Sequence, residues 1–146
     1  MLYAEDLAVA LDALATPLPA TGRPVALVLE GPGDLIALAH ALDVVGCVVA
    51  VPGTDAIPVD RIAAAMPAAY VLVCADNDQA GERLRVELSH AVVAHGGHVA
   101  HVRLPEGVND LDDQRRALDC DDDAFATWWW STVEALDWSE VGRVAA

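Results

Sequence analysis

Two short apolar segments that end abruptly at acidic residues constrain the fold of this chain more than any other feature. Residues 25–30 end in Glu30 and lead into Gly-Pro-Gly-Asp, and residues 70–75 lead into Asp76-Asn-Asp78. Both segments are rich in Val and Leu, and each is followed by a segment whose apolar residues have helical spacing. This pattern is typical of buried parallel strands. Open α/β sheets bind their ligands at the carboxyl ends of such strands. We therefore expect Glu30, Asp76 and Asp78 to converge at one edge of a sheet.

Converging carboxylates are suited to Mg²⁺, and Mn²⁺ accepts the same kind of ligand. Mg²⁺ fills the rest of its shell with water and substrate phosphates, so a protein supplies only a few carboxylates. Asp76 and Asp78 lie two positions apart and share a face of an extended chain, with Asn77 pointing away. The alternative is that Asp-Asn-Asp is only a turn that caps the next helix. That alternative does not explain why a second strand also ends in an acid, Glu30, so we predict a metal site.

Four motifs follow one another in a specific order, and together they resemble a known family. They are Glu30-Gly31-x-x-Asp34, Val51-Pro52-Gly53-Thr54, Asp76-x-Asp78-x-Ala80-Gly81, and Leu104-Pro105-x-Gly107 with Asp110 and Asp113 downstream. In this order and spacing they resemble a Toprim domain of the type found in bacterial and phage primases. The resemblance runs from about Val25 to Asp113, roughly three fifths of the 146 residues.

The resemblance implies metal-dependent nucleotidyl transfer for RNA primer synthesis, with nucleic acid and nucleotides as partners. Glu30 would act as a general base or orient the metal, and the expected Mg²⁺ ligands are Glu30, Asp76 and Asp78. A pair of metal ions would activate the attacking hydroxyl and neutralise the leaving pyrophosphate. The residues expected to line the cofactor site are Gly31, Gly33, Asp34 and Gly81, with Asp34 and Asp110 as further candidate metal ligands.

The glycines and Asp34 also have a local interpretation. Gly31-Pro32-Gly33 is expected to form a tight loop, because glycine adopts positive φ and lets backbone amides face a site. Asp34 occupies the position expected for the N-cap of the helix that follows. Capping and a role near the metal are compatible for this residue.

The predicted fold is a compact α/β domain with a four-stranded, largely parallel sheet flanked by helices, and with extra helices at both ends. The length of 146 residues suits a single domain. We divide the chain into an N-terminal helix and linker (1–24), a catalytic domain (25–118) and an acidic, Trp-rich helix (119–146). The expected strands are 25–30, 46–51, 70–75 and 98–104, and the expected helices include 2–15, 60–66 and 79–94.

Three consecutive tryptophans, Trp128, Trp129 and Trp130, stand in the C-terminal helix. Consecutive helical residues spread over about 200° of the helix surface, so one core cannot bury all three. Aromatic side chains are favoured at protein interfaces. We therefore expect at least one of the three to be half exposed or in an interface, formed either by self-association or with a partner.

The negative net charge of the chain is unfavourable for binding nucleic acid. The formal net charge is −15, with eight Arg and no Lys, whereas binding to a phosphate backbone depends on cations. Either the host is salt-adapted and the acidity keeps the protein soluble, or another chain binds the nucleic acid. The second explanation predicts a component of a larger assembly, with a helicase or another replication protein as partner. The sequence has neither a long apolar run nor a basic N-terminal region, so we expect a cytoplasmic protein with no membrane contact.

Two other functions fit the same residues. A Toprim-type nuclease would use the same acids to hydrolyse phosphodiesters, which cleavage of labelled nucleic acid would distinguish from primer extension. A non-catalytic interaction module would keep the fold and use the Trp helix for assembly. It would bind its partner even after the loss of Asp76.

Overall fold

The computed structural model describes residues 25–42, 47–51, 59–65 and 70–136. Within these ranges no helix is long and apolar enough to cross a bilayer. The elements in chain order are β1 (Val25–Glu30), α2 (Pro32–Ala41), β2 (Cys47–Val51), α3 (Val59–Ala65), β3 (Tyr70–Cys74), α4 (Gln79–Ala94), β4 (His98–His101), α5 (Leu111–Ala117) and α6 (Asp122–Glu134).

The four strands of the described residues form one parallel sheet in the order β2-β1-β3-β4. β1 pairs with β2 on one side and with β3 on the other, and β3 pairs with β4. The chain first winds from β1 to one edge and then continues beyond β1 in the other direction, so the winding reverses between the two central strands. Open α/β sheets bind ligands at such a reversal, outside the carboxyl ends of the strands. The predicted α/β fold with a four-stranded parallel sheet is confirmed.

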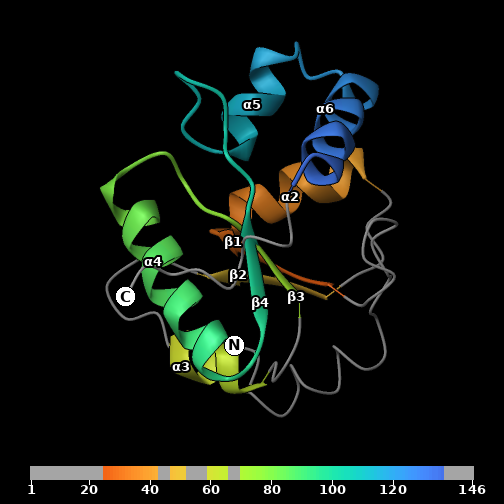
Figure 1. Cartoon of the computed structure of the whole chain (residues 1–146). Coiled ribbons are helices and arrows are strands. Elements are labelled where there is room, and N and C mark those ends of the chain that lie inside the picture. Colours follow the sequence, from red (N-terminus) through yellow and green to blue (C-terminus); the bar gives the residue numbers. More distant parts are fainter. Residues whose placement is uncertain (1–24, 43–46, 52–58, 66–69, 137–146) are drawn as a thin grey trace.

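Helices cover both faces of the sheet, so the sheet is the middle of three layers (Figure 1). Alternate residues of a strand point to opposite faces, and both faces here carry apolar side chains. Val28 and Val71 are buried on the face covered by α3 and α4. Leu29 and Leu72 are buried on the other face, together with residues of α2, α5 and α6 such as Phe125. Burial on both faces explains why the strands are apolar runs without polar alternation.

Most expected elements agree with the structure, and their bounds differ slightly. The helix expected over 60–66 is α3, one residue earlier, and the helix expected over 79–94 is α4. The fourth strand is shorter than the expected range 98–104, because β4 ends at His101. The expected N-terminal helix and linker (1–24), the Pro-Gly-Thr turn at 52–54 and the end of the C-terminal segment (137–146) lie outside the described residues.

The three tryptophans of α6 differ in burial, as the helical spacing requires. Trp129 is buried in the core beside Phe125, Trp128 is partly buried, and Trp130 is 42% exposed. The N-cap of the helix is Asp121, whose side chain accepts hydrogen bonds from the backbone N–H groups of residues 123 and 124. The expectation that at least one tryptophan is half exposed is therefore confirmed, while self-association stays a prediction.

Gly81 joins α4 to the end of β3 by a close backbone contact. A Cβ atom at this position would lie 2.1 Å from the backbone oxygen of Asp76 and 2.8 Å from its nitrogen. No side chain fits at such distances, so only glycine allows the first turn of α4 to approach the backbone of Asp76. This contact is the structural reason for the glycine in Asp-x-Asp-x-Ala-Gly.

We predict that Gly81→Ala lowers the free energy of unfolding by about 3 kcal/mol or more, because an overpacked site must move backbone atoms. The matched control is Gly33→Ala, also in the first turn of a helix, where a Cβ would meet nothing within 4 Å. That change should be neutral or stabilising by up to about 1 kcal/mol, because alanine favours helix. Urea denaturation of the two variants measures the difference, and equal stability would contradict the role of the contact.

Candidate metal centre

Glu30 and Asp76 lie at the carboxyl ends of the two central strands, β1 and β3, which are neighbours in the sheet. The backbone N–H of Asp76 donates a hydrogen bond to Oε2 of Glu30 over 3.2 Å. This bond joins residues that are 46 positions apart in the chain. The expected convergence of Glu30 with the Asp-x-Asp segment therefore takes place at the reversal between β1 and β3.

Asp34 is not the N-cap of α2, and this expectation was wrong. The N-cap is Gly31, with φ of +107°, and Pro32 occupies the first helical position. Proline suits that position because its fixed φ is helical. It has no N–H, and an N–H at the first helical position has no partner within the helix. Asp34 therefore falls inside the first turn, where the residue is only 4% exposed. Its Oδ1 accepts a hydrogen bond of 3.0 Å from the backbone N–H of Leu111, which ties α2 to α5.

The predicted loop at Gly31-Pro32-Gly33 is correct for one glycine only. Gly31 has the positive φ expected of it, whereas Gly33 lies inside α2 and has no positive φ. A Cβ atom at position 33 would meet nothing within 4 Å, so this position does not require glycine for steric reasons. The proposed cofactor contacts of both glycines stay predictions.

Asp78 and Asp110 are both helix caps. Oδ1 of Asp78 accepts a bond of 2.8 Å from the N–H of Gly81, at the start of α4. Oδ1 of Asp110 accepts a bond of 2.7 Å from the N–H of Asp113, at the start of α5. Capping uses one oxygen of each carboxylate, so it does not exclude a second role for the other oxygen. The capping interpretation and the metal interpretation of these acids are compatible.

We call Glu30, Asp34, Asp76, Asp78 and Asp110 the acidic cluster. Burial and the closeness of these carboxylates to one another dominate its electrostatics. Burial, followed by the charges of Glu30, Asp34, Asp110 and Asp78, raises the pKa of Asp76 to about 7. The pKa of Asp34 is raised to about 6, chiefly by burial, against the lowering effect of its bond from Leu111. Oδ1 of Asp76 is buried and has no hydrogen-bond partner among the described residues.

A buried oxygen without a partner is a position that a cation could satisfy. Within the described ranges, however, no three His, Cys, Asp or Glu side chains are arranged to hold a metal ion by themselves. Mg²⁺ usually needs only one or two carboxylates, because water and substrate phosphates complete its octahedral shell. The donor atoms are all hard oxygens, so the residues fit Mg²⁺ or Mn²⁺ in this partial manner. Cys74 is not a candidate ligand, because its thiol is buried and burial raises its pKa.

Arg85 supports the backbone beside Asp76, a role that no sequence pattern indicated. Nε of Arg85 donates a hydrogen bond to Oε2 of Glu82 over 2.9 Å, which forms an ion pair. The guanidinium is 5% exposed and also donates to the backbone oxygens of Ala75, at 2.9 Å, and Asp76, at 3.2 Å. These bonds fix the backbone that carries the Asp76 carboxylate. A buried arginine looks the same in sequence as an exposed one, so only its neighbours identify it.

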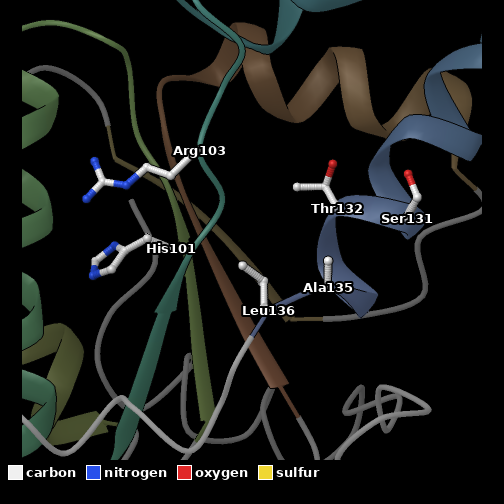
Figure 2. A pocket seen from close by; sticks show the side chains of 6 residues that line it. All are labelled: His101, Arg103, Ser131, Thr132, Ala135 and Leu136. Carbon is white, nitrogen blue, oxygen red and sulfur yellow. The ribbon is translucent and has the colours of Figure 1, made fainter.

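A hollow of about 420 Å³ lies elsewhere, along β4 and the last turn of α6. Figure 2 shows His101 and Arg103 pointing to one side of the β4 segment, with Thr132, Ala135 and Leu136 on the other side. None of its lining residues belongs to the acidic cluster. The hollow is therefore separate from the candidate metal centre.

Ser89 and His101, near this hollow, do not form a nucleophilic pair. The hydroxyl of Ser89 donates to the backbone oxygen of Arg85 over 2.6 Å. Nε2 of His101, 3.0 Å from the same hydroxyl oxygen, must therefore be the donor in their bond. Burial, helped by the charges of Arg103 and Arg85, lowers the pKa of His101 to about 4, so the ring is neutral at pH 7. A neutral ring that donates to the serine cannot remove its proton.

The comparisons with known proteins agree with the motifs. Residues 27–115, more than half of the chain, match the protein family described as Toprim-like. Among solved structures, the chain is similar to the crystal structure of a DNA primase domain from Pseudomonas aeruginosa, with 30% sequence identity and a TM-score of 0.46. That similarity covers 64% of this chain and 29% of the other chain. No match is found among curated proteins.

We predict that the metal-free protein loses stability as the pH rises from about 4 to about 7. Native Asp34 and Asp76, with pKa values of about 6 and 7, hold protons that the unfolded chain has already released. Their contribution is complete below the ordinary value of 3.8 and is lost as the pH passes the native values. Each group contributes at most about 1.4 kcal/mol per pH unit, and less where solvent screens it.

Urea denaturation in EDTA across this pH range measures the slope. Asp76→Asn should make the slope shallower, whereas Asp60→Asn, the same change at an exposed carboxylate on α3, should leave it unchanged. Equal slopes in wild type and Asp76→Asn would contradict the raised pKa of Asp76.

Proposed function

The chain belongs to the Toprim-like family, and from that membership and the acidic cluster we propose a primase-type domain for metal-dependent nucleotidyl transfer in RNA primer synthesis. Toprim domains are typically the catalytic parts of primases, topoisomerases and nucleases, and they generally bind a divalent metal. The primase type is favoured by Pro52-Gly53-Thr54 and by the Asp-x-Asp-x-Ala-Gly segment. The observation that carries the proposal is the contact of Glu30 with Asp76 beside a buried, unpaired carboxylate oxygen.

The proposed roles of the acids are ones that their hydrogen bonds allow. Asp76 and Asp78 would hold Mg²⁺ or Mn²⁺, with Asp110 as a further ligand through the oxygen that does not cap α5. Once bound, the cation would neutralise negative charge on the phosphates of the substrate. Asp34 has one oxygen committed to Leu111, so it acts mainly by holding α5 and by adding negative charge.

Glu30 is the proposed general base. Its Oε2 accepts the N–H of Asp76, which fixes the carboxylate at the end of β1. The other oxygen is left to accept the proton of an attacking hydroxyl. The nucleotide phosphates would lie beside the backbone amides near Gly31 and the first turn of α4 at Gly81. The N-terminus of a helix favours such anions.

The domain is proposed to work as a component of a larger assembly. Most arginines of the described residues are engaged, because Arg85, Arg103, Arg115 and Arg116 each form an ion pair with an acidic side chain. Among the described residues, few cations are then left to hold a phosphate backbone, and the net charge of the chain is −15. Another chain, such as a helicase or another replication protein, would supply the grip on nucleic acid.

The double variant Asp76→Asn, Asp78→Asn should lose more than about 100-fold in Mn²⁺ affinity, since even changes behind the ligands cost about 10- to 100-fold. Asp60→Asn, Glu87→Gln removes the same charge at exposed positions of α3 and α4 and should bind Mn²⁺ like the wild type. Calorimetry measures affinity, and circular dichroism confirms that both variants fold.

The reaction is tested with labelled nucleotides and single-stranded DNA, with and without a candidate partner. Primer extension that the Asp76→Asn, Asp78→Asn variant lacks supports the proposal. Cleavage without extension would replace it with the nuclease function. Partner binding that survives in a protein without metal affinity would identify an interaction module.

Self-association through Trp130 is the second part of the assembly proposal. Trp130→Ser should weaken the association of wild-type chains at least about tenfold, because buried interface tryptophans carry much of the binding energy. Val86→Ser changes another exposed apolar residue, on α4, and should have no effect. Sedimentation velocity over a range of concentrations measures association, and Mn²⁺ affinity should be unchanged in both variants. A wild-type protein that stays monomeric throughout would contradict this part.

A further inference from the structure

The side chain of Asn77, between the two acids of Asp76-Asn77-Asp78, faces the loop that follows β4. Its Nδ2 lies 2.8 Å from the backbone oxygen of Val108, 3.3 Å from that of Pro105 and 3.4 Å from that of Leu104. These carbonyls are 27 to 31 residues away in the chain. One amide group thus gathers three carbonyls of a single loop.

The chemistry of this contact requires an amide. An asparagine NH₂ group has two hydrogens, and its donors can be shared among several carbonyl oxygens. An aspartate has the same shape but only acceptor oxygens, so it would repel all three carbonyls. This explains why the middle residue of an acidic triplet is neutral although both of its neighbours carry carboxylates.

The same loop leads directly to Asp110, and it is held at both sides of that residue. Before Asp110, the backbone N–H of Asn77 donates to the oxygen of Asn109 over 2.8 Å, beside the side-chain contacts. After Asp110, the N–H of Leu111 donates to Asp34. Asp110 is close enough to Asp34 and Asp76 for its charge to raise the pKa of both.

We propose that Asn77 is a positioning residue that holds Asp110 within the carboxylate cluster, so that the loop after β4 and the turn after β3 form one cation site. The inference rests on the proposed function, since it assumes a cation bound by these acids. Asn77 does not touch the cation. It opposes the mutual repulsion of the acids, which would otherwise move the loop away from the turn.

Two of the three hydrogen bonds are exposed to solvent and the third is partly buried, so the effect of the contact on overall stability is small compared with its effect on the position of one loop. Exposed hydrogen bonds contribute little to folding, because water replaces the lost partner. A metal site is more sensitive, because its affinity depends on where each ligand lies. The role of Asn77 should therefore be visible in metal binding before it is visible in denaturation.

The test compares Mn²⁺ affinity by calorimetry for the wild type, Asn77→Ala and Asn77→Asp. Both variants should bind Mn²⁺ about 10- to 100-fold more weakly, as outer-shell changes do. The result for Asn77→Asp is informative, because a purely electrostatic site would bind more tightly with an added carboxylate. Asn109→Ala is the matched control, since the Asn109 side chain is exposed and forms no hydrogen bond in the described part of the chain. It should bind within about twofold of the wild type.

A double-mutant cycle with Asp110→Asn shows whether Asn77 acts through Asp110. In that background Asn77→Ala should cause no further loss of affinity. Hydrogen exchange of the amides of residues 106–111 should be faster in Asn77→Ala than in the wild type, with and without Mn²⁺.

Two results would overturn the inference while leaving the proposed function intact. One is wild-type Mn²⁺ affinity in Asn77→Ala, and the other is an equal loss of affinity with and without Asp110. Absence of Mn²⁺ binding by the wild type would instead remove the proposed function and, with it, this role of Asn77.

Discussion

Negative charge gathered at the carboxyl ends of β1 and β3 is the condition on which the rest of the site depends. Parallel strands place their ends at one edge, and here both central strands continue into acids, so Glu30 and Asp76 lie beside each other. Burial and mutual repulsion raise the pKa of Asp76 to about 7. Such a cluster is unstable when fully charged, and protons or a divalent cation relieve it in the same way.

The neighbouring structure holds these acids in place with neutral or positively charged groups. Arg85 fixes the backbone of Asp76 from the side of α4, and Gly81 lets α4 approach that backbone closely. Asn77 gathers the loop that carries Asp110, and the N–H of Leu111 satisfies Asp34. Helix caps use further carboxylate oxygens. Local stability and the proposed chemistry therefore use the same residues, which explains why each acid also has an ordinary structural interpretation.

The acidic surface and the C-terminal helix give the domain its proposed place in an assembly. Ion pairs engage most arginines of the described residues, and the excess of acids discourages unaided contact with phosphates. α6 completes the core with Phe125 and Trp129 and leaves Trp130 exposed. One helix thus both stabilises the fold and carries the exposed tryptophan that we propose contacts another chain.

The sequence by itself determined the sheet and the identity of the central acids. Apolar runs of β-branched residues ending in Gly, Asp or Glu indicated parallel strands, and parallel strands bring their carboxyl ends together, so Glu30, Asp76 and Asp78 could be named without a structure. Helix caps such as Asp78 and Asp110 were also predictable, because capping depends on residues only three positions apart. Helix capping and the apolar runs of buried strands depend on residues that are close together in the chain, so the sequence shows them directly.

Only the tertiary structure decided what Asp34, Asn77 and Arg85 do. Asp34 was expected to cap α2, but Pro32 begins the helix and turns Asp34 inward to Leu111, 77 residues away. Asn77 was expected only to point away from the acids, and its partners lie on a loop about 30 residues later. Arg85 is buried against backbone oxygens that no side-chain pattern marks. Each of these roles depends on a backbone group brought close by folding, and backbone groups are the same in every residue, so the sequence could not indicate which of them would become partners.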